Sequence, residues 1–102
     1  MWHDRAVFHF LIAAEDRAGY ARALADALRP GGIAIIATFA EDGPKMCSGL
    51  PVARYAPEAL AQELDRLLPG NFEALYARHH MHITPKRNSQ SFQYSVFRNT
   101  DR

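Results

Sequence analysis

The feature that most constrains the fold is an apolar run, Ile33–Phe39, that directly follows a Pro30-Gly31-Gly32 turn. Thr38 is the one residue of the run with a polar side chain, so a strand built from it would be apolar on both faces. Such a strand is typical of the interior of a covered, parallel sheet. Sheets of this kind usually bind small ligands at the carboxyl ends of their strands. The run therefore predicts an α/β fold with a ligand-binding edge.

Length and composition narrow the class of protein. The 102 residues suffice for one small domain. The formal net charge of +1 gives no reason to expect nucleic acid or a membrane surface as a partner. The single cysteine, Cys47, excludes an internal disulfide and indicates a reducing compartment. We find neither a secretory signal nor an apolar run of the ~20 residues that span a bilayer, and we expect a cytoplasmic protein.

Apolar spacing predicts two helices and two further strands. Glu15–Leu28 carries an apolar stripe at three- and four-residue spacing, as does Pro57–Leu68. Phe72–Ile83 and Ser91–Arg98 read as strands, and the short link between them favours an antiparallel hairpin. With Ile33–Phe39, the expected order is helix, strand, helix, strand, strand.

Three other segments are less regular. Ala6–Ala14 is apolar and short, and both a strand and a buried helical turn fit it. Residues 40–55 lack periodicity, which predicts a long ordered loop of the kind that often serves function. The tail at 99–102 is expected to fray.

The aromatic side chains are expected to pack in the core, because their spacing follows the periods of the expected elements. They are Tyr20, Tyr55, Phe72, Tyr76, Phe92 and Phe97. In the last strand, alternation places Phe92, Tyr94 and Val96 on one face and Gln93 and Ser95 on the other.

Several segments, in this order and spacing, resemble class I S-adenosylmethionine-dependent methyltransferases of a small-molecule, type-11/12-like branch. WHDRAVFHFL at 2–11 is similar to the segment at the fourth strand of that family, and LRPGG at 28–32 to the turn before its fifth strand. FAEDGP at 39–44 and CSGLPVARY at 47–55 are similar to the loop after that strand. HITP at 82–85 and QSFQY at 90–94 resemble the final hairpin.

The resemblance implies a partial Rossmann-like sheet that matches only the carboxyl-terminal half of the family's seven strands. The amino-terminal half, with its glycine-rich cofactor loop, is not matched. We therefore interpret residues 1–102 as a single truncated methyltransferase-like domain that binds no cofactor and methylates nothing on its own; S-adenosylmethionine is implied for the full-length family. A cofactor cradle needs glycines between a strand and a helix, whereas Gly31-Gly32 precedes a strand and reads more simply as a helix stop.

Several residues are candidates for a functional site. Asp4 could form an acid/base pair with His9 or with His3, and in the family the match to Asp4 lies near the substrate. The resemblance also places Arg5 beside the methyl-acceptor pocket, and Arg54 and Tyr55 resemble a substrate-side arginine–tyrosine pair. For each residue a structural or solvent-exposed role is the simpler alternative.

The histidines and the cysteine suggest other chemistry. On a strand, His80 and His82 would share a face at a spacing that suits a metal, with His79 beside them. Solvated strand residues are the favoured interpretation, and we expect no metal. Cys47 has no histidine at a spacing typical of a nucleophile.

A sheet that lacks half of its strands would leave an edge uncovered, and an open edge favours pairing with another chain. We expect a homodimer with Ile33–Phe39 or Ala6–Ala14 at or near the seam, or else a complementary chain that supplies the missing half. Three functions remain open. They are a methyltransferase-like fragment, which we favour, a non-enzymatic homodimeric module for a small ligand or protein, and a metal-binding protein that uses the histidines.

Overall fold

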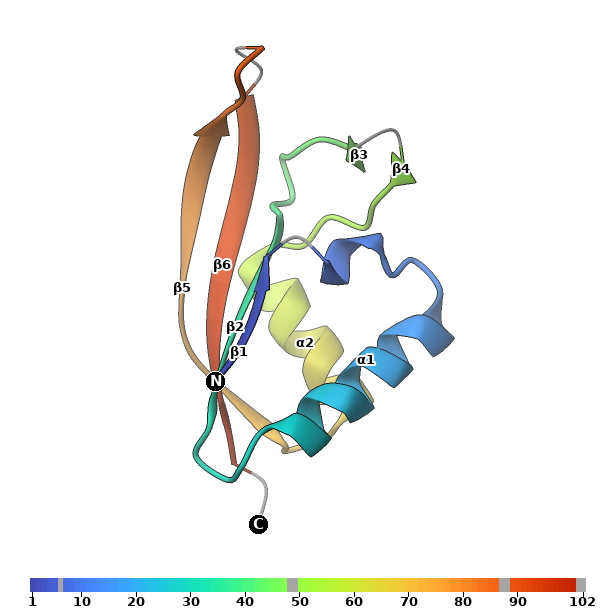
Figure 1. Ribbon diagram of the computed structural model, residues 1–102, viewed down its shortest axis with the longest axis vertical. Coiled ribbons are helices and arrows are strands. Elements are labelled where there is room, and N and C mark those ends of the chain that lie inside the picture. Colours follow the sequence, from blue (N-terminus) through green and yellow to red (C-terminus); the bar gives the residue numbers. More distant parts are fainter. Residues whose placement is uncertain (6, 48–49, 87–88, 101–102) are drawn as a thin grey trace.

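The computed structural model describes residues 1–5, 7–47, 50–86 and 89–100. It consists of one four-stranded sheet with both α-helices on the same side (Figure 1). In chain order the elements are β1 (Trp2–Arg5), the 3-10 helix η1 (Phe8–Phe10), α1 (Ala14–Ala27), β2 (Ile33–Phe39), β3 (Met46–Cys47), β4 (Leu50–Pro51), α2 (Pro57–Leu67), β5 (Phe72–Ile83) and β6 (Ser89–Asn99).

The strand order in the sheet is β1-β2-β6-β5. β1 and β2 are parallel and are joined through α1, whereas β2–β6 and β6–β5 are antiparallel pairs. The apolar run Ile33–Phe39 is thus an interior strand, as expected, but it has a parallel neighbour on one side only. Because β2 is paired on both sides, it is not itself an open edge, and the expected dimer seam at or near Ile33–Phe39 stays a prediction. Within the described residues, the edge strands of the sheet are β1 and β5.

The expected α/β architecture is confirmed, with most element bounds within a residue or two. β2 and β5 have the predicted bounds, and each helix differs from its prediction by at most one residue at either end. β6 runs two residues further at its start and one at its end than Ser91–Arg98. In Ala6–Ala14, for which both a strand and a helical turn fitted the sequence, Phe8–Phe10 forms a single 3-10 turn and Ala14 already belongs to α1. Residue 6 lies outside the described part. The additional strand of the four-stranded sheet is β1, which spacing alone did not predict.

The core lies between the two helices and one face of the sheet. α2 contributes Leu60 and Leu64, both fully buried, as its apolar stripe predicts. On α1 the spacing predicted a buried stripe of Tyr20, Leu24, Ala27 and Leu28, but Ala27 is exposed and Ala21 is buried instead. The buried cluster comprises Phe8, Leu24, Leu28, Ala34, Ile36, Tyr55, Leu60, Leu64 and Phe97. Tyr55 and Phe97 are therefore core residues, as expected.

The covered face of β6 is largely polar. Gln93 is fully buried there, and its amide donates to Thr38 Oγ1 at 3.0 Å and to the Ile36 carbonyl at 3.3 Å. The Ser95 hydroxyl donates in turn to the Gln93 carbonyl oxygen. The alternation in this strand was predicted correctly, but Phe92 on the opposite face is only half-buried, and Tyr76 on β5 is 59% exposed. The expected core position of Tyr76 is wrong, because both α-helices cover the other face of the sheet.

The Pro30-Gly31-Gly32 turn is fixed by the end of β6. Gly31 has φ +81°, a conformation that favours glycine, and its N–H donates to the Asn99 carbonyl at 2.7 Å. The Asn99 side chain donates to the carbonyl of Leu28 at 3.0 Å, and its own N–H donates to Gly32 at 2.8 Å. The turn is thus a helix stop, as expected. Asn99 is buried rather than frayed, which corrects the expectation for the tail; residues 101–102 lie outside the described part.

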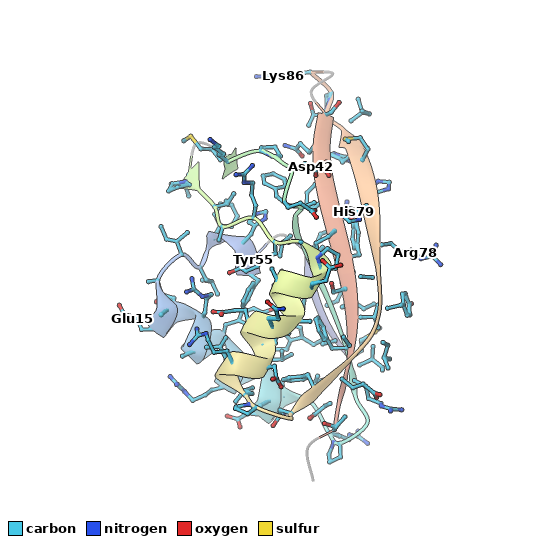
Figure 2. All side chains as sticks on the ribbon, turned by 180° about the vertical axis from the view of Figure 1, so that it is seen from behind. Glu15, Asp42, Tyr55, Arg78, His79 and Lys86 are labelled. Atoms are coloured by element: carbon cyan, nitrogen blue, oxygen red, sulfur yellow. The ribbon has the colours of Figure 1, made fainter. Side chains whose placement is uncertain are left out.

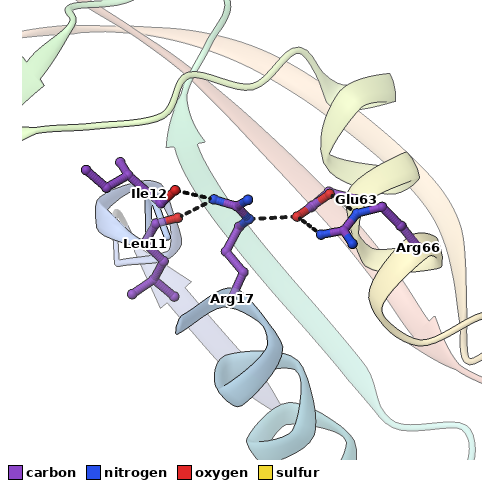
Figure 3. Close-up of polar contacts among 5 residues, drawn as sticks. All are labelled: Leu11, Ile12, Arg17, Glu63 and Arg66. Atoms are coloured by element: carbon purple, nitrogen blue, oxygen red, sulfur yellow. Dashed lines mark hydrogen bonds and ion pairs between the residues drawn. The ribbon is translucent and has the colours of Figure 1, made fainter. Parts of the chain in front are cut away.

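One arginine joins the two helices (Figure 3). Arg17 on α1 donates from Nε to Glu63 on α2 at 2.7 Å, and its Nη1 donates to the carbonyls of Leu11 and Ile12 at 2.9 Å each. Arg66 donates to the same carboxylate from one turn further along α2. Since Arg17 and Glu63 are largely buried, this bonding fixes the start of α1 against α2 and the segment that leaves η1.

Candidate functional site

The candidate site lies at the carboxyl ends of the parallel strands β1 and β2. The chain leaves β1 through η1 and leaves β2 through the loop at 40–56 (Figure 1). This loop is ordered against its neighbours, because the Ala53 N–H donates to the His9 carbonyl at 2.7 Å and the Tyr55 N–H donates to Phe39 at 3.0 Å. Its middle forms a small hairpin, β3–β4, that the sequence did not predict. The side chain of Cys47 in β3, and residues 48–49, lie outside the described part.

Asp4 is buried at the end of β1, and its carboxylate is fully engaged. Oδ1 accepts from the Val7 N–H at 2.8 Å, and Oδ2 accepts from the Phe8 N–H at 3.0 Å and from the Tyr20 hydroxyl at 2.6 Å. Burial and the hydrogen bond to Asp4 raise the pKa of Tyr20, so this hydroxyl keeps its proton and donates. The hydroxyl also accepts from Trp2 Nε1 at 2.9 Å. Asp4 therefore fixes the turn into η1 and fastens β1 to α1.

His9 is fully buried in η1, one turn beyond Asp4. Its Nδ1 accepts from the Phe39 N–H at 2.9 Å, so a neutral ring carries its proton on Nε2. Nε2 is the only buried side-chain polar atom without a hydrogen-bond partner among the described residues. Burial lowers the pKa of His9, which favours the neutral ring. Since Nδ1 is bonded to Phe39 and Nε2 has no partner, His9 and Asp4 are neighbours that share no hydrogen bond.

The three residues expected to bind substrate are not brought together. Arg5 follows Asp4 on β1 and is exposed on the face of the sheet opposite the helices. Arg54 is exposed on the loop, where Nη1 donates to the Gly43 carbonyl at 3.2 Å. Tyr55 is buried, its ring packs on Phe8 at 5.4 Å between centroids, and burial raises the pKa of its hydroxyl. The substrate roles of these residues stay predictions.

Sequence reasoning missed a polar group at the same edge. Glu41 and Asp42 lie just beyond the end of β2. Glu41 Oε1 lies 3.0 Å from His79 Nε2, and Asp42 Oδ1 accepts a hydrogen bond from the Ser91 hydroxyl at 2.6 Å. The contact between Glu41 and His79 raises the pKa of His79 and lowers the pKa of Glu41. The hydrogen bond from Ser91 lowers the pKa of Asp42. Figure 2 labels Asp42 and His79, which approach this edge from β2 and β5. Two adjacent acids just beyond a buried strand were the available signal.

The histidines of β5 point to opposite faces. His79 faces Glu41, whereas the rings of His80 and His82 lie against Tyr94 and Phe92, with centroids 6.1 and 6.3 Å apart. His80 and His82 do share a face, as the strand period predicts. Within the described residues, no three His, Cys, Asp or Glu side chains are grouped so that they could hold a metal ion.

Comparison of the fold with solved structures identifies its type. No family model matches the sequence, and no curated protein matches it. A SAM-dependent methyltransferase from Methanosarcina mazei matches with a TM-score of 0.65 and 15% identity, over 95% of this chain and 57% of that chain. The chain has a methyltransferase-like fold. A second match is a structure described for the conversion of a disulfide bond into a thioacetal group during echinomycin biosynthesis, with TM-score 0.65, 14% identity, 95% of this chain and 47% of that one.

This methyltransferase-like chain spans about half the length of the structures that it matches. The match covers nearly all of its own length, so the sheet and both helices belong to the shared part. Among the described residues, no helix of this chain combines the length and the apolar character needed to cross a membrane.

Proposed function

We propose that this chain is the acceptor-side part of a SAM-dependent methyl-transfer site, and that another polypeptide segment or chain binds the cofactor. The observation that carries the proposal is the edge of β1. This strand pairs with β2 alone among the described residues, while the matched structures continue for about as many residues again. The lone cysteine supports a cytoplasmic setting.

The position of the glycines supports a divided site. A nucleotide cofactor in an open α/β sheet lies at the carboxyl ends of the strands, against a glycine-rich turn from strand to helix. Here Gly31 and Gly32 lie at the amino end of β2 and are bonded to Asn99. A Cβ on Gly32 would approach the Arg29 carbonyl to 2.9 Å, so the close contact there is with the chain itself. The described residues do not fit a cofactor cradle.

The chain's own contribution would be to shape the acceptor side. Asp4 holds the turn that leaves β1, and the loop from β2 is tied to η1 and β6. Glu41, Asp42 and His79 then line the carboxyl end of β2 with two carboxylates that accept hydrogen bonds and one imidazole, the group among them that can exchange a proton near neutral pH. These groups suit a polar small molecule as the methyl acceptor.

Calorimetric titration with S-adenosylmethionine tests the proposal. The isolated chain should give no saturable heat at millimolar cofactor, whereas the M. mazei methyltransferase in the same buffer serves as the positive control. Binding of one cofactor per single copy with micromolar affinity would contradict the proposal, because it would place the complete cradle within these residues.

A homodimer without enzymatic activity is a second candidate, favoured by the same open edge. Two copies of β1 paired edge to edge would continue the sheet across a twofold axis. Light scattering over a concentration series should then show a dimer, and the outward amides of Trp2–Arg5 should exchange more slowly with deuterium as the dimer forms. A monomer at all concentrations would leave the edge free for a complementary chain. The structure offers no comparable observation in favour of the metal-binding alternative.

A further inference from the structure

The face of the sheet that the helices leave open carries a second group of polar and aromatic side chains, on β5 and β6. Residues paired across antiparallel strands share a face, and the register pairs Arg78 with Tyr94 and His80 with Phe92. Gln93 and Ser95 occupy the covered face of β6, so Phe92 and Tyr94 lie on the open one. Figure 2 shows Arg78 pointing away from α2, on the far side of β5.

These side chains surround a hollow of about 350 Å³, lined by Arg78, His79, His80 and Tyr94. The His80 and Tyr94 rings meet edge to face with centroids 6.1 Å apart, and the Phe92 ring lies 6.3 Å from Tyr94 at an interplanar angle of 33°. The volume lies at the lower end of the range for small-molecule sites. An aromatic wall of this kind offers its π faces to a planar ring.

The charge around the hollow favours an anion. Glu41, which lies beyond β2, is already paired with His79. Two acids lie in the four strands of the sheet within the described residues, and Asp4 is on the covered face. The other, Glu73, is paired with Arg98 near the opposite end of β5. Arg78 is exposed and forms no ion pair within the described part of the chain. A guanidinium that has no carboxylate of its own can bind phosphate or carboxylate through paired N–H donors.

We propose that this hollow binds a planar ring that carries an anionic group, with the ring against Tyr94 and His80 and the phosphate or carboxylate on Arg78. The proposal does not rest on the proposed methyl-transfer function, because Arg78, His80 and Tyr94 lie on the opposite face of the sheet, and His79 is the one lining residue that also contacts Glu41. A chain or copy that pairs with the β1 edge would leave the hollow accessible.

Titration followed by amide NMR tests the proposal with defined probes. The probes are uridine monophosphate, uridine, inorganic phosphate and orotate. The ring in the three organic probes is a pyrimidine, so that a site for the adenine of the cofactor would not be mistaken for this one. Uridine monophosphate, orotate or both should shift the amides of Arg78, His80 and Tyr94 and bind at least about tenfold more tightly than uridine or phosphate alone. Equal binding of all four probes, or shifts located elsewhere, would overturn the proposal.

Two variants and a control locate the ring and the anion. Arg78→Gln should weaken binding of the anionic probe about tenfold, and Tyr94→Leu should weaken binding while it keeps an apolar side chain against the sheet. Arg22→Gln, an exposed arginine on α1, should change nothing. If Arg78→Gln is folded by NMR and binds as well as the parent chain, or if Arg22→Gln weakens binding as much, the hollow is not the site.

Discussion

The two faces of the sheet differ in what covers them, and therefore in how well the sequence describes them. On the covered face, α1 and α2 bury Ala34, Ile36 and Phe97 against leucines at helical spacing. On the open face, Tyr76 and His80 are exposed to solvent, although β5 is a strand of 12 residues that pairs with β6 along its length. Strand formation and burial are thus separate properties here: pairing made β5 a strand, and the helices alone decided which face became core.

The largest expected effect contrasts the two faces directly. Leu64→Ala removes a fully buried side chain from α2, and we expect a loss of about 2–5 kcal/mol in the free energy of unfolding. Tyr76→Ala on the open face should change it by only about 0.5 kcal/mol. Urea denaturation of the two variants measures both. Equal losses would show that something covers the open face, such as a second copy of the chain.

A second test concerns the polar side chains of the covered face. Gln93→Leu removes the donor to Thr38 and Ile36 and the acceptor of Ser95, which leaves buried polar groups without partners. We expect a destabilisation of about 1–3 kcal/mol. Gln62→Leu on the exposed side of α2 is the matched control and should be close to neutral. A neutral Gln93→Leu would mean that the face tolerates an apolar side chain there.

The third test uses pH to probe the buried ring of His9. Its pKa is lowered in the folded chain, so between that value and about 6.5 the unfolded chain binds more protons. Stability should therefore fall as the pH drops below about 6.5, and His9→Gln should remove this part of the pH dependence while its amide oxygen can still accept from Phe39. Thermal melts from pH 5 to pH 8 measure the effect. The same slope in parent and variant would assign it to another group.

The smallest effect is expected at the pair His79–Glu41, in which both side chains are about half exposed. The contact that raises the pKa of His79 stabilises the fold at low pH, and this stabilisation is lost as the pH rises through the raised pKa. The contact that lowers the pKa of Glu41 stabilises the fold at higher pH. The pair therefore contributes mainly between the ordinary pKa values of the two groups, about 4.3 and 6.5. In Glu41→Gln, the NMR titration midpoint of His79 should move down towards its ordinary value. An unchanged midpoint would show that the contact does not persist in solution.

The elements were predictable where the signal is local. The helix stop at Pro30-Gly31-Gly32, the apolar run of β2 and the leucine stripe of α2 each depend on residues within one or two turns of the chain, and all three were found as predicted. β1 was not predicted from its spacing, because a four-residue edge strand carries too little pattern and is defined by pairing with β2. For the candidate site, the sequence pointed to Asp4 and His9, which the fold places at the carboxyl end of β1, but it could not show that the Asp4 carboxylate accepts hydrogen bonds from Val7, Phe8 and Tyr20.

By itself, the sequence determined both α-helices, the strands β2, β5 and β6 in their order, and the resemblance to a methyltransferase-like fold. Periodicity, turn residues and short motifs are local properties, so they can be read without knowing what packs where. The tertiary structure decided that Gln93 lies inside and Tyr76 outside, that His79 meets Glu41 from a strand 38 residues away, and that β1 is an edge. Those facts depend on which surfaces meet, and a face becomes core only when another element covers it.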